Sequence, residues 1–410
     1  MKITDIEMTR IYPRLIGGSD EQTARLHQQR GIGGQLVYKI TTDNGIVGYG
    51  EHRWKEQTPP LSSVEPLIGR DPFDFINNTF HPSLGGALYD VMGKHLEVPA
   101  YKLMGRKLRD AVTVCAWTPS GSSPTAYAEQ VARAVKQGYM VFKIHTSATY
   151  DVFDLARAAA EVTPEGFKLH FDFNHSRTIA SVLPIIDQIQ REHPIVGFIE
   201  DPLPAWDLDN WRRLRAKMRI PLVHGGAPLL GGIQEAQHGM ADAYMIGESS
   251  IGDILARGIA YGKLNTQVIM QHTGGTLAKA LALHMASVLP TATGHSINLD
   301  DQYSESITTE DIPVTEGFSP VPERPGLGFD VDESAIARMA ENKPDEVPRY
   351  VPLLHLPGGH KFYAADVKRL TGREEGTIRG IRMEWIEDDG SDEFNEIFEK
   401  VEKGAVVSAD

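Results

Sequence analysis

The sequence predicts an α/β protein whose larger part is a closed parallel barrel of strand–helix units, a (β/α)8 barrel, next to a smaller α+β region. From about residue 112, strand-like runs alternate with amphipathic helices at regular intervals, which is typical of a parallel sheet. Two of these runs end abruptly in carboxylates, at the position where parallel barrels carry their chemistry. At 410 residues the chain is also too long for one simple core, so we expect two domains.

The first hundred residues are predicted to be mainly antiparallel β, followed by helix. Strand-like runs occupy residues 3–12, 35–42 and 46–51, and the Asp43-Asn44-Gly45 sequence between the last two is a hairpin turn. Residues 14–34 contain several Gly and Arg residues and are predicted to form a loop. The pattern of residues 60–105 is helical, most clearly over 86–94.

The barrel is expected to occupy the middle of the chain. Its predicted strands are 112–117, 140–146, 168–174, 196–201, 221–225, 241–246 and 267–272, and the helices between them include 126–137, 152–161, 179–191 and 208–217. Seven or eight such units close into a barrel. A doubly wound sheet is the alternative, but no Gly-rich phosphate-binding sequence follows the first strand.

After about residue 320 the alternation stops. Residues 324–332 are rich in turn formers, and residues 369–410 are strongly acidic and partly helical in pattern. The acidic run 387–393 is predicted to be a solvated turn rather than a site.

Composition excludes several classes of protein. The formal net charge is −14 and the sequence has no basic patch, so neither nucleic acid nor an anionic membrane is expected as a partner. Cys115 is the single cysteine, which excludes an intrachain disulfide and fits a cytoplasmic location. No signal peptide is expected at the N-terminus, and no apolar run is long enough to span a bilayer.

Two neighbouring strands are predicted to bring carboxylates together. Asp172 follows the run Lys168 to Phe171, and Glu200 follows Val196 to Ile199. Two carboxylates at one barrel mouth repel each other unless a cation or a proton lies between them. A hard divalent ion such as Mg²⁺, which prefers oxygen ligands, is the expected occupant. The alternative is that both acids only cap the helices that follow.

Lys143 and His145 end the strand before Asp172. They are two residues apart on a strand, so both side chains point to the same face. A lysine inside a barrel needs a charge partner, and the carboxylates of the next two strands provide one. The imidazole of His145 is suited to proton transfer near neutral pH. Without this context, a Lys-x-His pair would be read as two surface residues.

A second acid/base group is predicted at the end of the seventh strand. There an apolar run ends in His272, and Asp242 stands at the beginning of the sixth strand. An aspartate on the neighbouring strand would accept the ring N–H of His272 and fix its tautomer. Equally, Asp242 would serve to cap the adjacent turn.

Taken in order, these residues resemble the mandelate racemase branch of the enolase superfamily, over roughly residues 1–335. The motifs that carry the resemblance are Gly45 to Glu51, Asp90-Val91-Met92-Gly93-Lys94 with Pro99, Leu103-Met104-Gly105 and Arg109, Lys143-x-His145, Asp172-x-Asn174, Glu200-Asp201-Pro202, Asp242, His272 and Pro325-Gly326-Leu327-Gly328. Each motif is weak alone, but their common order is specific.

The resemblance implies an architecture and a chemistry. Residues 1–110 would form an α+β capping domain, and residues 111–318 would form the catalytic barrel. The C-terminal segment, residues 319–410, would return to the capping domain and end in an acidic tail. Family members bind Mg²⁺ between three carboxylates and stabilise the enediolate formed when a base removes the proton α to a substrate carboxylate. By resemblance, Asp172 and Glu200 are ligands, Asn174 lies beside the site, and Asp242 with His272 forms a dyad. Where the family has Lys-x-Lys, this chain has Lys143-x-His145.

The fifth strand departs from the family pattern. A third metal-binding carboxylate is expected near Gly226, and the next acid in the chain is Glu235. Three explanations remain open: His224 supplies nitrogen or binds a water, Mg²⁺ keeps water at the third position, or the site is metal-poor and its chemistry is changed. A histidine ligand would also suit Mn²⁺, Fe²⁺ or Zn²⁺. We expect weak metal binding with only two carboxylate ligands. His224 lies two residues before Gly226 on the same strand and is therefore expected to point into the barrel.

The function expected by resemblance is that of a lyase, specifically a sugar-acid dehydratase acting on a small-molecule carboxylate. A racemase or epimerase of a 2-hydroxy acid is the first alternative, and a non-catalytic, metal-deficient homologue is the second. Substrate contacts are expected from loops of the capping domain, with Arg25, His27 and His52 as candidates, although each is equally readable as an exposed loop residue. Family members also lead us to expect a homo-oligomer.

Overall fold

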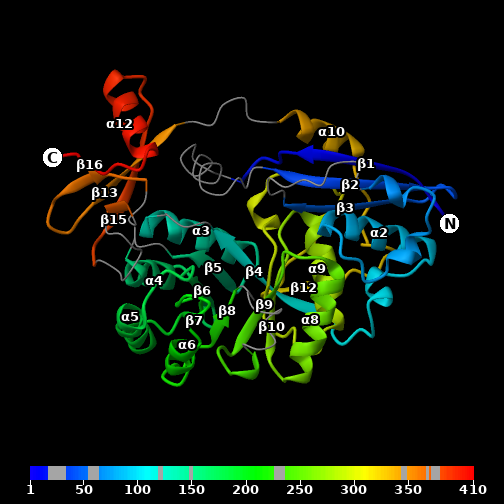
Figure 1. Cartoon of the computed structure of the whole chain (residues 1–410), viewed down its shortest axis with the longest axis horizontal. Coiled ribbons are helices and arrows are strands. Elements are labelled where there is room, and N and C mark those ends of the chain that lie inside the picture. Colours follow the sequence, from blue (N-terminus) through cyan, green and yellow to red (C-terminus); the bar gives the residue numbers. More distant parts are fainter. Residues whose placement is uncertain are drawn as a thin grey trace.

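The computed structural model describes residues 1–16, 34–53, 64–118, 123–146, 151–225, 236–342, 349–365, 369–370 and 379–410. These residues form three parts (Figure 1). A central barrel lies below an N-terminal sheet with its helix, and a small C-terminal sheet stands at the opposite side of the molecule from the N-terminus.

The predicted (β/α)8 barrel is confirmed. Parallel strands pair in chain order, and the last pairs with the first to close the ring. The strands are β4 (Ala111–Thr118), β5 (Val141–His145), β6 (Lys168–Asp172), β7 (Val196–Glu200), β8 (Leu222–His224), β9 (Ala243–Gly247), β10 (Gln267–Gln271) and β11 (Ser296–Ile297). Strand β12 (Phe318–Pro320) adds an antiparallel pair to β4. The closing strand β11 has two residues, too few to show a periodic pattern, which is why the sequence did not reveal it.

Helices surround the barrel. They are α3 (Pro124–Lys136), α4 (Val152–Ala160), α5 (Ile179–Glu192), α6 (Leu208–Arg215), α8 (Ile251–Lys263) and α9 (Thr276–Val288). Five of them begin at a side chain that accepts a backbone N–H of the first turn, which fixes where each helix starts. These capping residues are Ser123, Asp151, Thr178, Asp207 and Ser250.

The interior of the barrel is divided by polarity. An apolar cluster contains inward-facing side chains of β4 and of β8 to β11, among them Trp117, Val223, Met245 and Ile269. The inward-facing positions of β5, β6 and β7 instead include Lys143 and the carboxylates that end β6 and β7, all buried. Charged side chains inside a barrel need partners, so this polar side marks the candidate site.

The N-terminal part is the predicted antiparallel sheet, in the order β1 (Ile3–Ile11), β2 (Gln35–Thr42), β3 (Val47–Arg53). Helix α2 (Pro82–His95) packs on β3, where Gly48 and Gly50 let the two backbones approach closely. Short 3-10 turns connect these elements: η2 (Glu65–Leu67), η3 (Pro72–Phe75), η4 (Ala100–Leu103) and, after β11, η6 (Asp300–Gln302).

After the barrel, the chain returns to this N-terminal sheet. Helix α10 (Glu333–Glu341) packs against β1, and the backbone N–H of Tyr12 donates to the carbonyl of Met339. The hydroxyl of Tyr49 in β3 also bonds Glu333. Segments from both sides of the barrel sequence therefore pack together here.

Residues beyond 349 form more than an acidic tail. They build a four-stranded antiparallel sheet in the order β15 (Arg382–Glu387), β13 (Tyr350–His355), β14 (Lys361–Tyr363), β16 (Val407–Ser408), with helix α12 (Asp392–Glu402). This unit stands beside α3 and α4 and away from β1 to β3 (Figure 1). Arg379 anchors it to the barrel, because its Nε lies 2.6 Å from Oδ2 of Asp151, the N-cap of α4.

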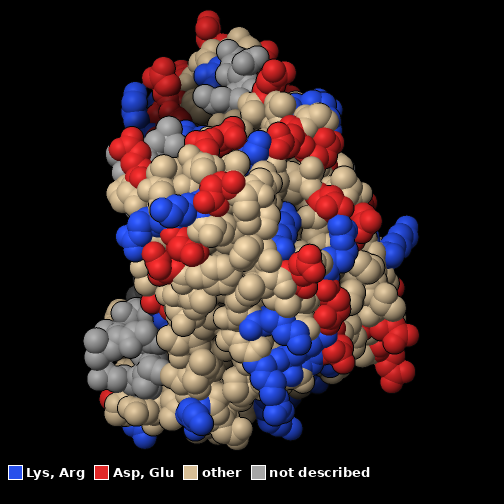
Figure 2. All heavy atoms as spheres, turned by 90° about the vertical axis from the view of Figure 1, so that its right-hand side faces the viewer, with Lys and Arg blue, Asp and Glu red and all other residues tan. Residues whose placement is uncertain are grey.

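Acidic and basic side chains both occur on the molecular surface. On the face shown in Figure 2, acidic side chains are scattered among basic and uncharged ones, and the basic ones gather most densely low on that face. Within the described residues, no helix is both long and apolar enough to cross a bilayer.

Candidate active site

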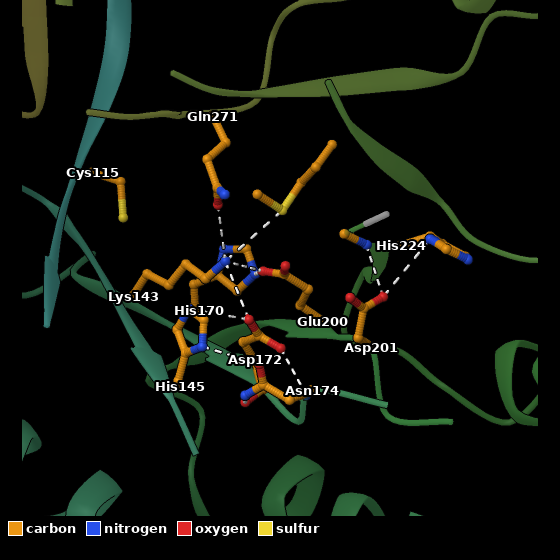
Figure 3. A network of polar contacts seen from close by, with 12 residues as sticks. Cys115, Lys143, His145, His170, Asp172, Asn174, Glu200, Asp201, His224 and Gln271 are labelled. Carbon is orange, nitrogen blue, oxygen red and sulfur yellow. Dashed lines mark hydrogen bonds and ion pairs between the residues drawn. The ribbon is translucent and has the colours of Figure 1, made fainter. Parts of the chain in front are cut away.

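Three buried carboxylates meet at the ends of β6 and β7. Strand register places Asp172 opposite Glu200, and Asp201 follows Glu200 directly. One oxygen from each of the three carboxylates lies within 4.8 Å of the others, close enough to hold a metal ion together. Figure 3 shows the cluster with the neighbouring side chains of β5 and β8.

Lys143 lies at the centre of the network (Figure 3). Its Nζ is 2.6 Å from Oε2 of Glu200 and 3.4 Å from Oδ2 of Asp172, and the side chain is buried. Burial alone would lower the pKa of Lys143, but the charges of Glu200 and Asp172 outweigh it and raise that pKa. Lys143 therefore remains an ammonium ion that partly neutralises the carboxylates.

The two paired carboxylates are affected differently by their surroundings. Burial raises the pKa of Glu200 to about 7, with the negative charge of Asp172 acting in the same direction and Lys143 opposing it. Burial would also raise the pKa of Asp172, but His145 and Lys143 outweigh it and hold that pKa well below its usual range. Asp172 is thus the firmly ionised member, and Glu200 depends on a nearby cation for its charge.

His145 stands at the mouth side of this cluster. Its Nε2 lies 3.4 Å from Oδ2 of Asp172, and its Nδ1 lies 3.0 Å from Oδ1 of Asn174. The backbone N–H of Asn174 donates to Oδ1 of Asp172 at 2.8 Å. Lys143, His145, Asp172, Asn174 and Glu200, all predicted from the sequence, are therefore brought together in one network.

The third carboxylate comes from the fourth strand rather than the fifth. Oδ1 of Asp201 accepts the N–H of Gly225 at 2.8 Å, and its Oδ2 lies 3.0 Å from Nε2 of His175. A Cβ at Gly225 would overlap both Oε1 of Glu200 and Oδ2 of Asp201. Glycine there leaves room for the carboxylates, so three carboxylates, rather than the expected two, lie close enough to hold a metal ion. Gly226 itself lies outside the described residues.

Backbone conformation helps to place these side chains. Asn174, His175 and Asp201 have φ values of 50°, 58° and 46°, in the left-handed region that side chains disfavour. Each costs roughly 1–2 kcal/mol, and such residues cluster at functional sites. The backbone of the turns after β6 and β7 is therefore strained, and this conformation directs the side chains of Asn174, His175 and Asp201 toward the cluster.

His224 does not point into the barrel, contrary to the sequence prediction. Its neighbour Val223 occupies the interior, so alternation along β8 turns His224 outward. There its ring stacks on Trp211 of α6 at 4.9 Å, and its Nδ1 approaches Oδ1 of Asp201 only to 3.8 Å. Burial lowers the pKa of His224 to about 4. Its place is behind the carboxylates, between the barrel and its helices.

On the other side of the mouth, His272 contacts the capping domain. Its ring is 4.7 Å from the ring of His52 in β3, and His81 is a further neighbour of His52 at 5.3 Å. Burial lowers the pKa of His272 well below its ordinary value, so the ring is neutral. From β10, it is Gln271 rather than His272 that reaches Lys143, with Oε1 at 3.3 Å from Nζ.

The predicted pairing of Asp242 with His272 is wrong. Asp242 directly precedes β9 and therefore lies at the N-terminal end of that strand, away from the mouth. Its Oδ1 pairs with Nε of Arg215 at 2.8 Å, and its Oδ2 accepts the N–H of Leu222. The carboxylate near His272 is Glu248, which follows β9 at the mouth end and lies 3.8 Å from Nε2 of His52.

Sequence reasoning missed Asp201 and Glu248 as site residues, although both carry the signal used for Asp172. Each is an acid at the carboxyl end of a buried strand. Both have left-handed backbone, with φ of 46° and 48°, which the sequence does not reveal. Of the predicted substrate contacts, His52 lies at the mouth, while Arg25 and His27 lie outside the described residues.

Known proteins match this chain over most of its length. The family model described as enolase C-terminal domain-like matches residues 126–247 and 254–335. A D-galactonate dehydratase from Variovorax paradoxus (strain S110) is 26% identical over 370 residues, covering 78% of this chain and 95% of that protein. One from Xanthomonas euvesicatoria pv. vesicatoria (strain 85-10) is 27% identical over 360 residues, covering 76% and 92%.

Solved structures share the fold at lower identity. A mandelate racemase/muconate lactonizing family protein from Azoarcus sp. EbN1 superposes with a TM-score of 0.68 at 21% identity, over 84% of this chain and 98% of that one. The N-succinyl Arg/Lys racemase from Bacillus cereus ATCC 14579 gives 0.65 at 21% identity, over 83% and 98%. The match to the enolase C-terminal domain-like family model, together with the dehydratase relatives, shows that the chain belongs to the enolase superfamily, whose fold these solved structures share.

Proposed function

We propose that this protein is a lyase that removes water from a sugar acid, starting with abstraction of the proton α to the carboxylate. The observation that carries the proposal is the buried cluster of Asp172, Glu200 and Asp201 with Lys143 beside it. It accompanies similarity to several D-galactonate dehydratases over three quarters of the chain.

The proposed cofactor is Mg²⁺, held by these three carboxylates. Their oxygens form the hard donor set that Mg²⁺ prefers. Because Gly225 has no side chain, the carboxylates of Glu200 and Asp201 can lie close to each other. When bound, Mg²⁺ draws electron density from the substrate carboxylate and so acidifies the neighbouring C–H. Lys143 competes for the same oxygens, which is consistent with modest metal affinity.

Three side chains receive proposed roles. Lys143, kept as an ammonium ion in a dry interior, stabilises negative charge that develops on the substrate acid group. His145, oriented by Asn174 and Asp172, takes the α-proton. The electron pair of that C–H bond forms the double bond as the C–O bond of the β-hydroxyl breaks. His272, which first takes up a proton from solvent, supplies that proton so that water leaves. Solvent restores both histidines.

Glu248 is proposed to support His272 indirectly. Its Oε2 is 3.8 Å from Nε2 of His52, and His52 contacts the His272 ring. Its Oε1 accepts from the backbone N–H of Thr273 at 3.0 Å, which fixes the turn carrying His272. His52, Arg25, His27 and Asn174 remain proposed substrate contacts, and a homo-oligomer in the cytoplasm remains a prediction.

A racemase or epimerase is the second candidate. Basic groups occur on two sides of the mouth, Lys143 and His145 on β5 and His272 after β10, and proton removal on one face with return on the other would need such an arrangement. The third candidate, a metal-deficient homologue, was motivated by the missing carboxylate near Gly226, and the position of Asp201 weakens that motivation.

The test is a screen of aldonic and aldaric acids, D-galactonate among them, with Mg²⁺ present. Dehydration is expected to give a 2-keto-3-deoxy acid, detected as its semicarbazone, and NMR in D₂O separates it from exchange at the α-carbon alone. Glu200→Gln serves as the inactive control. Neither product formation nor α-exchange with any acid, with Mg²⁺ or Mn²⁺, would overturn the proposal; exchange without elimination would favour the racemase.

A further inference from the structure

Two histidines fill the barrel interior directly beneath the carboxylates. His170 lies on β6, two residues before Asp172, and His295 immediately precedes β11. Both are buried, with Nδ1 of His170 at 2.8 Å from Nε2 of His295. Phe198 of β7 packs on both rings, at 5.5 and 4.8 Å. Neither histidine was predicted from the sequence to have a role.

His170 reaches Glu200 with its other nitrogen. Its Nε2 lies 2.7 Å from Oε2 of Glu200, the same oxygen that Nζ of Lys143 approaches at 2.6 Å. The other oxygen, Oε1, is turned toward Gly225, on the side where Asp201 lies. Oε2 of Glu200 therefore faces Lys143 and His170, and Oε1 faces the side of the site where Asp201 lies (Figure 3).

The donor pattern of this chain of groups is fixed by chemistry. An ionised carboxylate only accepts hydrogen bonds, and a neutral imidazole has one N–H and one acceptor nitrogen. The 2.7 Å contact at Glu200 does not have hydrogen-bond geometry in this structure, whereas the contact between the two histidines does. Both contacts are satisfied when Nε2–H of His170 turns to donate to Glu200 and Nδ1 of His170 accepts from Nε2–H of His295. The opposite tautomer of His170 would set two lone pairs against each other at Glu200.

We propose that His170, oriented by His295, is a positioning residue for Glu200: it holds Oε2 so that Oε1 is presented to a divalent metal ion. The inference rests on the proposed function and deepens its metal site. Lys143 cannot supply this alone, because its ammonium is shared with Asp172 and has freely rotating donors on a long stem. The imidazole is a rigid, neutral donor packed between Phe198 and His295.

Substitution of His170 by Phe separates positioning from packing. Phenylalanine keeps a ring against Phe198 but donates no hydrogen bond, so Glu200 is released while the core remains filled. Loss of an outer partner of a metal ligand typically weakens metal binding by about 10–100-fold, and we expect that range for Mn²⁺ measured by calorimetry without substrate. His170→Gln, whose amide can donate to Glu200, is expected to recover most of the affinity.

His284 provides the matched control. It is also a fully buried histidine, on α9, whose Nε2 lies 3.3 Å from the carbonyl oxygen of Leu327 and whose ring contacts Tyr101. His284→Phe makes the same chemical change away from the cluster, and Mn²⁺ affinity should change less than twofold. Should His170→Phe not fold, His295→Phe removes the donor to His170 instead and is expected to weaken Mn²⁺ binding by a smaller factor, about 3–10-fold.

The metal-free protein gives an independent readout. Side-chain ¹H–¹⁵N NMR should place the proton of His170 on Nε2, with Nδ1 unprotonated. A proton on Nδ1 would overturn the inference, as would a folded His170→Phe or His295→Phe protein that binds Mn²⁺ as the parent does. A protein inactive on every acid that still loses Mn²⁺ affinity in His170→Phe would keep this inference and reject the dehydratase proposal.

Discussion

The two sides of the barrel mouth are built in opposite ways. On the side of β5, β6 and β7, charged groups find their partners within the chain: Lys143 lies between Glu200 and Asp172, and His145 contacts Asp172 and Asn174. On the side of β9 and β10, His272 is buried, yet neither of its ring nitrogens has a hydrogen-bond partner among the described residues. The first side is held together by opposite charges, and the second leaves a buried polar ring without a hydrogen bond among the described residues.

This difference suggests a division of labour. Opposite charges on adjacent strands neutralise each other, so the carboxylate side is organised before any ligand arrives. A buried polar group without a partner costs about 1–3 kcal/mol, which a substrate hydroxyl placed against His272 would offset. We therefore expect the carboxylate side to bind the metal and the acid group, and the histidine side to meet the hydroxyl that leaves.

The largest effect should come from the carboxylate side. Glu200→Gln keeps the shape but removes the charge that faces Lys143 and one metal oxygen, so turnover should fall by more than about 10³-fold together with Mg²⁺ affinity. Steady-state rates and metal titration measure both losses. The exposed Glu161, changed to Gln, should leave them unaltered; a Glu200→Gln protein with normal turnover would remove this side from the mechanism.

Removing the His272 ring should distinguish the role of the histidine side from that of the carboxylate side. His272→Ala is expected to lower kcat by about 10²–10⁴-fold, as loss of a general acid does, while Mn²⁺ affinity stays within twofold of the parent. Parallel kinetics and calorimetry provide the comparison. Near-normal turnover would exclude His272 from catalysis, and a matching loss of metal affinity would show that the two sides are not independent.

Crowding the carboxylates should have a smaller effect. In Gly225→Ala, the added methyl group would overlap Glu200 and Asp201, so the two must separate and Mn²⁺ should bind about tenfold less tightly. Gly358, where an added methyl group would meet only Cδ2 of His360 at an ordinary contact distance of 3.9 Å, is the matched control for the same substitution. Unchanged affinity in Gly225→Ala would mean that the cluster tolerates a side chain and that Asp201 is not held against strand five.

The smallest effect concerns Glu51, which lies in β3 beside His52. Burial raises its pKa to about 7, and its Oε1 accepts the N–H of Leu277 at 2.8 Å. Because this pKa is higher in the folded than in the unfolded chain, the folded protein binds more protons, and stability is lost as pH rises from about 4.5 to 7.

Replacing Glu51 by Gln removes this titration. Above pH 7, the melting temperature of the Glu51→Gln protein should be roughly 2 °C higher than that of the parent, and at pH 4.5 the two should differ little. Thermal unfolding at several pH values measures the change. If Glu51→Gln lost as much stability between pH 5 and pH 8 as the parent does, Glu51 would not be the source of the pH dependence.

The sequence was informative wherever a buried run stopped at a polar residue. Asp172 and Glu200 were placed correctly because period-two alternation and parallel strand ends suffice to bring them together. Asp242 was misplaced because it directly precedes its strand, and the start of a parallel strand lies at the opposite end of the barrel. His224 was misplaced because β8 has three residues, too few for the alternation to show which face is inside.

Other features depend on tertiary structure that no local pattern encodes. Asp201 joins the cluster through a left-handed backbone at its own position, and His170 finds His295 across the closed barrel, far away in the sequence. The C-terminal sheet was hidden by acidic composition and by Pro352 within β13. Long-range partners decide these placements, and a single sequence does not identify such partners.

The most direct test of the central claim is calorimetric titration of metal-free protein with Mn²⁺ and Mg²⁺, comparing Asp201→Asn with Asp242→Asn. Both changes replace one aspartate by its amide, but only Asp201 belongs to the carboxylate cluster, while Asp242 pairs with Arg215 at the other end of the barrel. We expect one ion per chain in the parent, at least tenfold weaker binding in Asp201→Asn, and unchanged binding in Asp242→Asn. Equal binding by both variants, or no binding by the parent at millimolar metal, would contradict a metal site built from Asp172, Glu200 and Asp201.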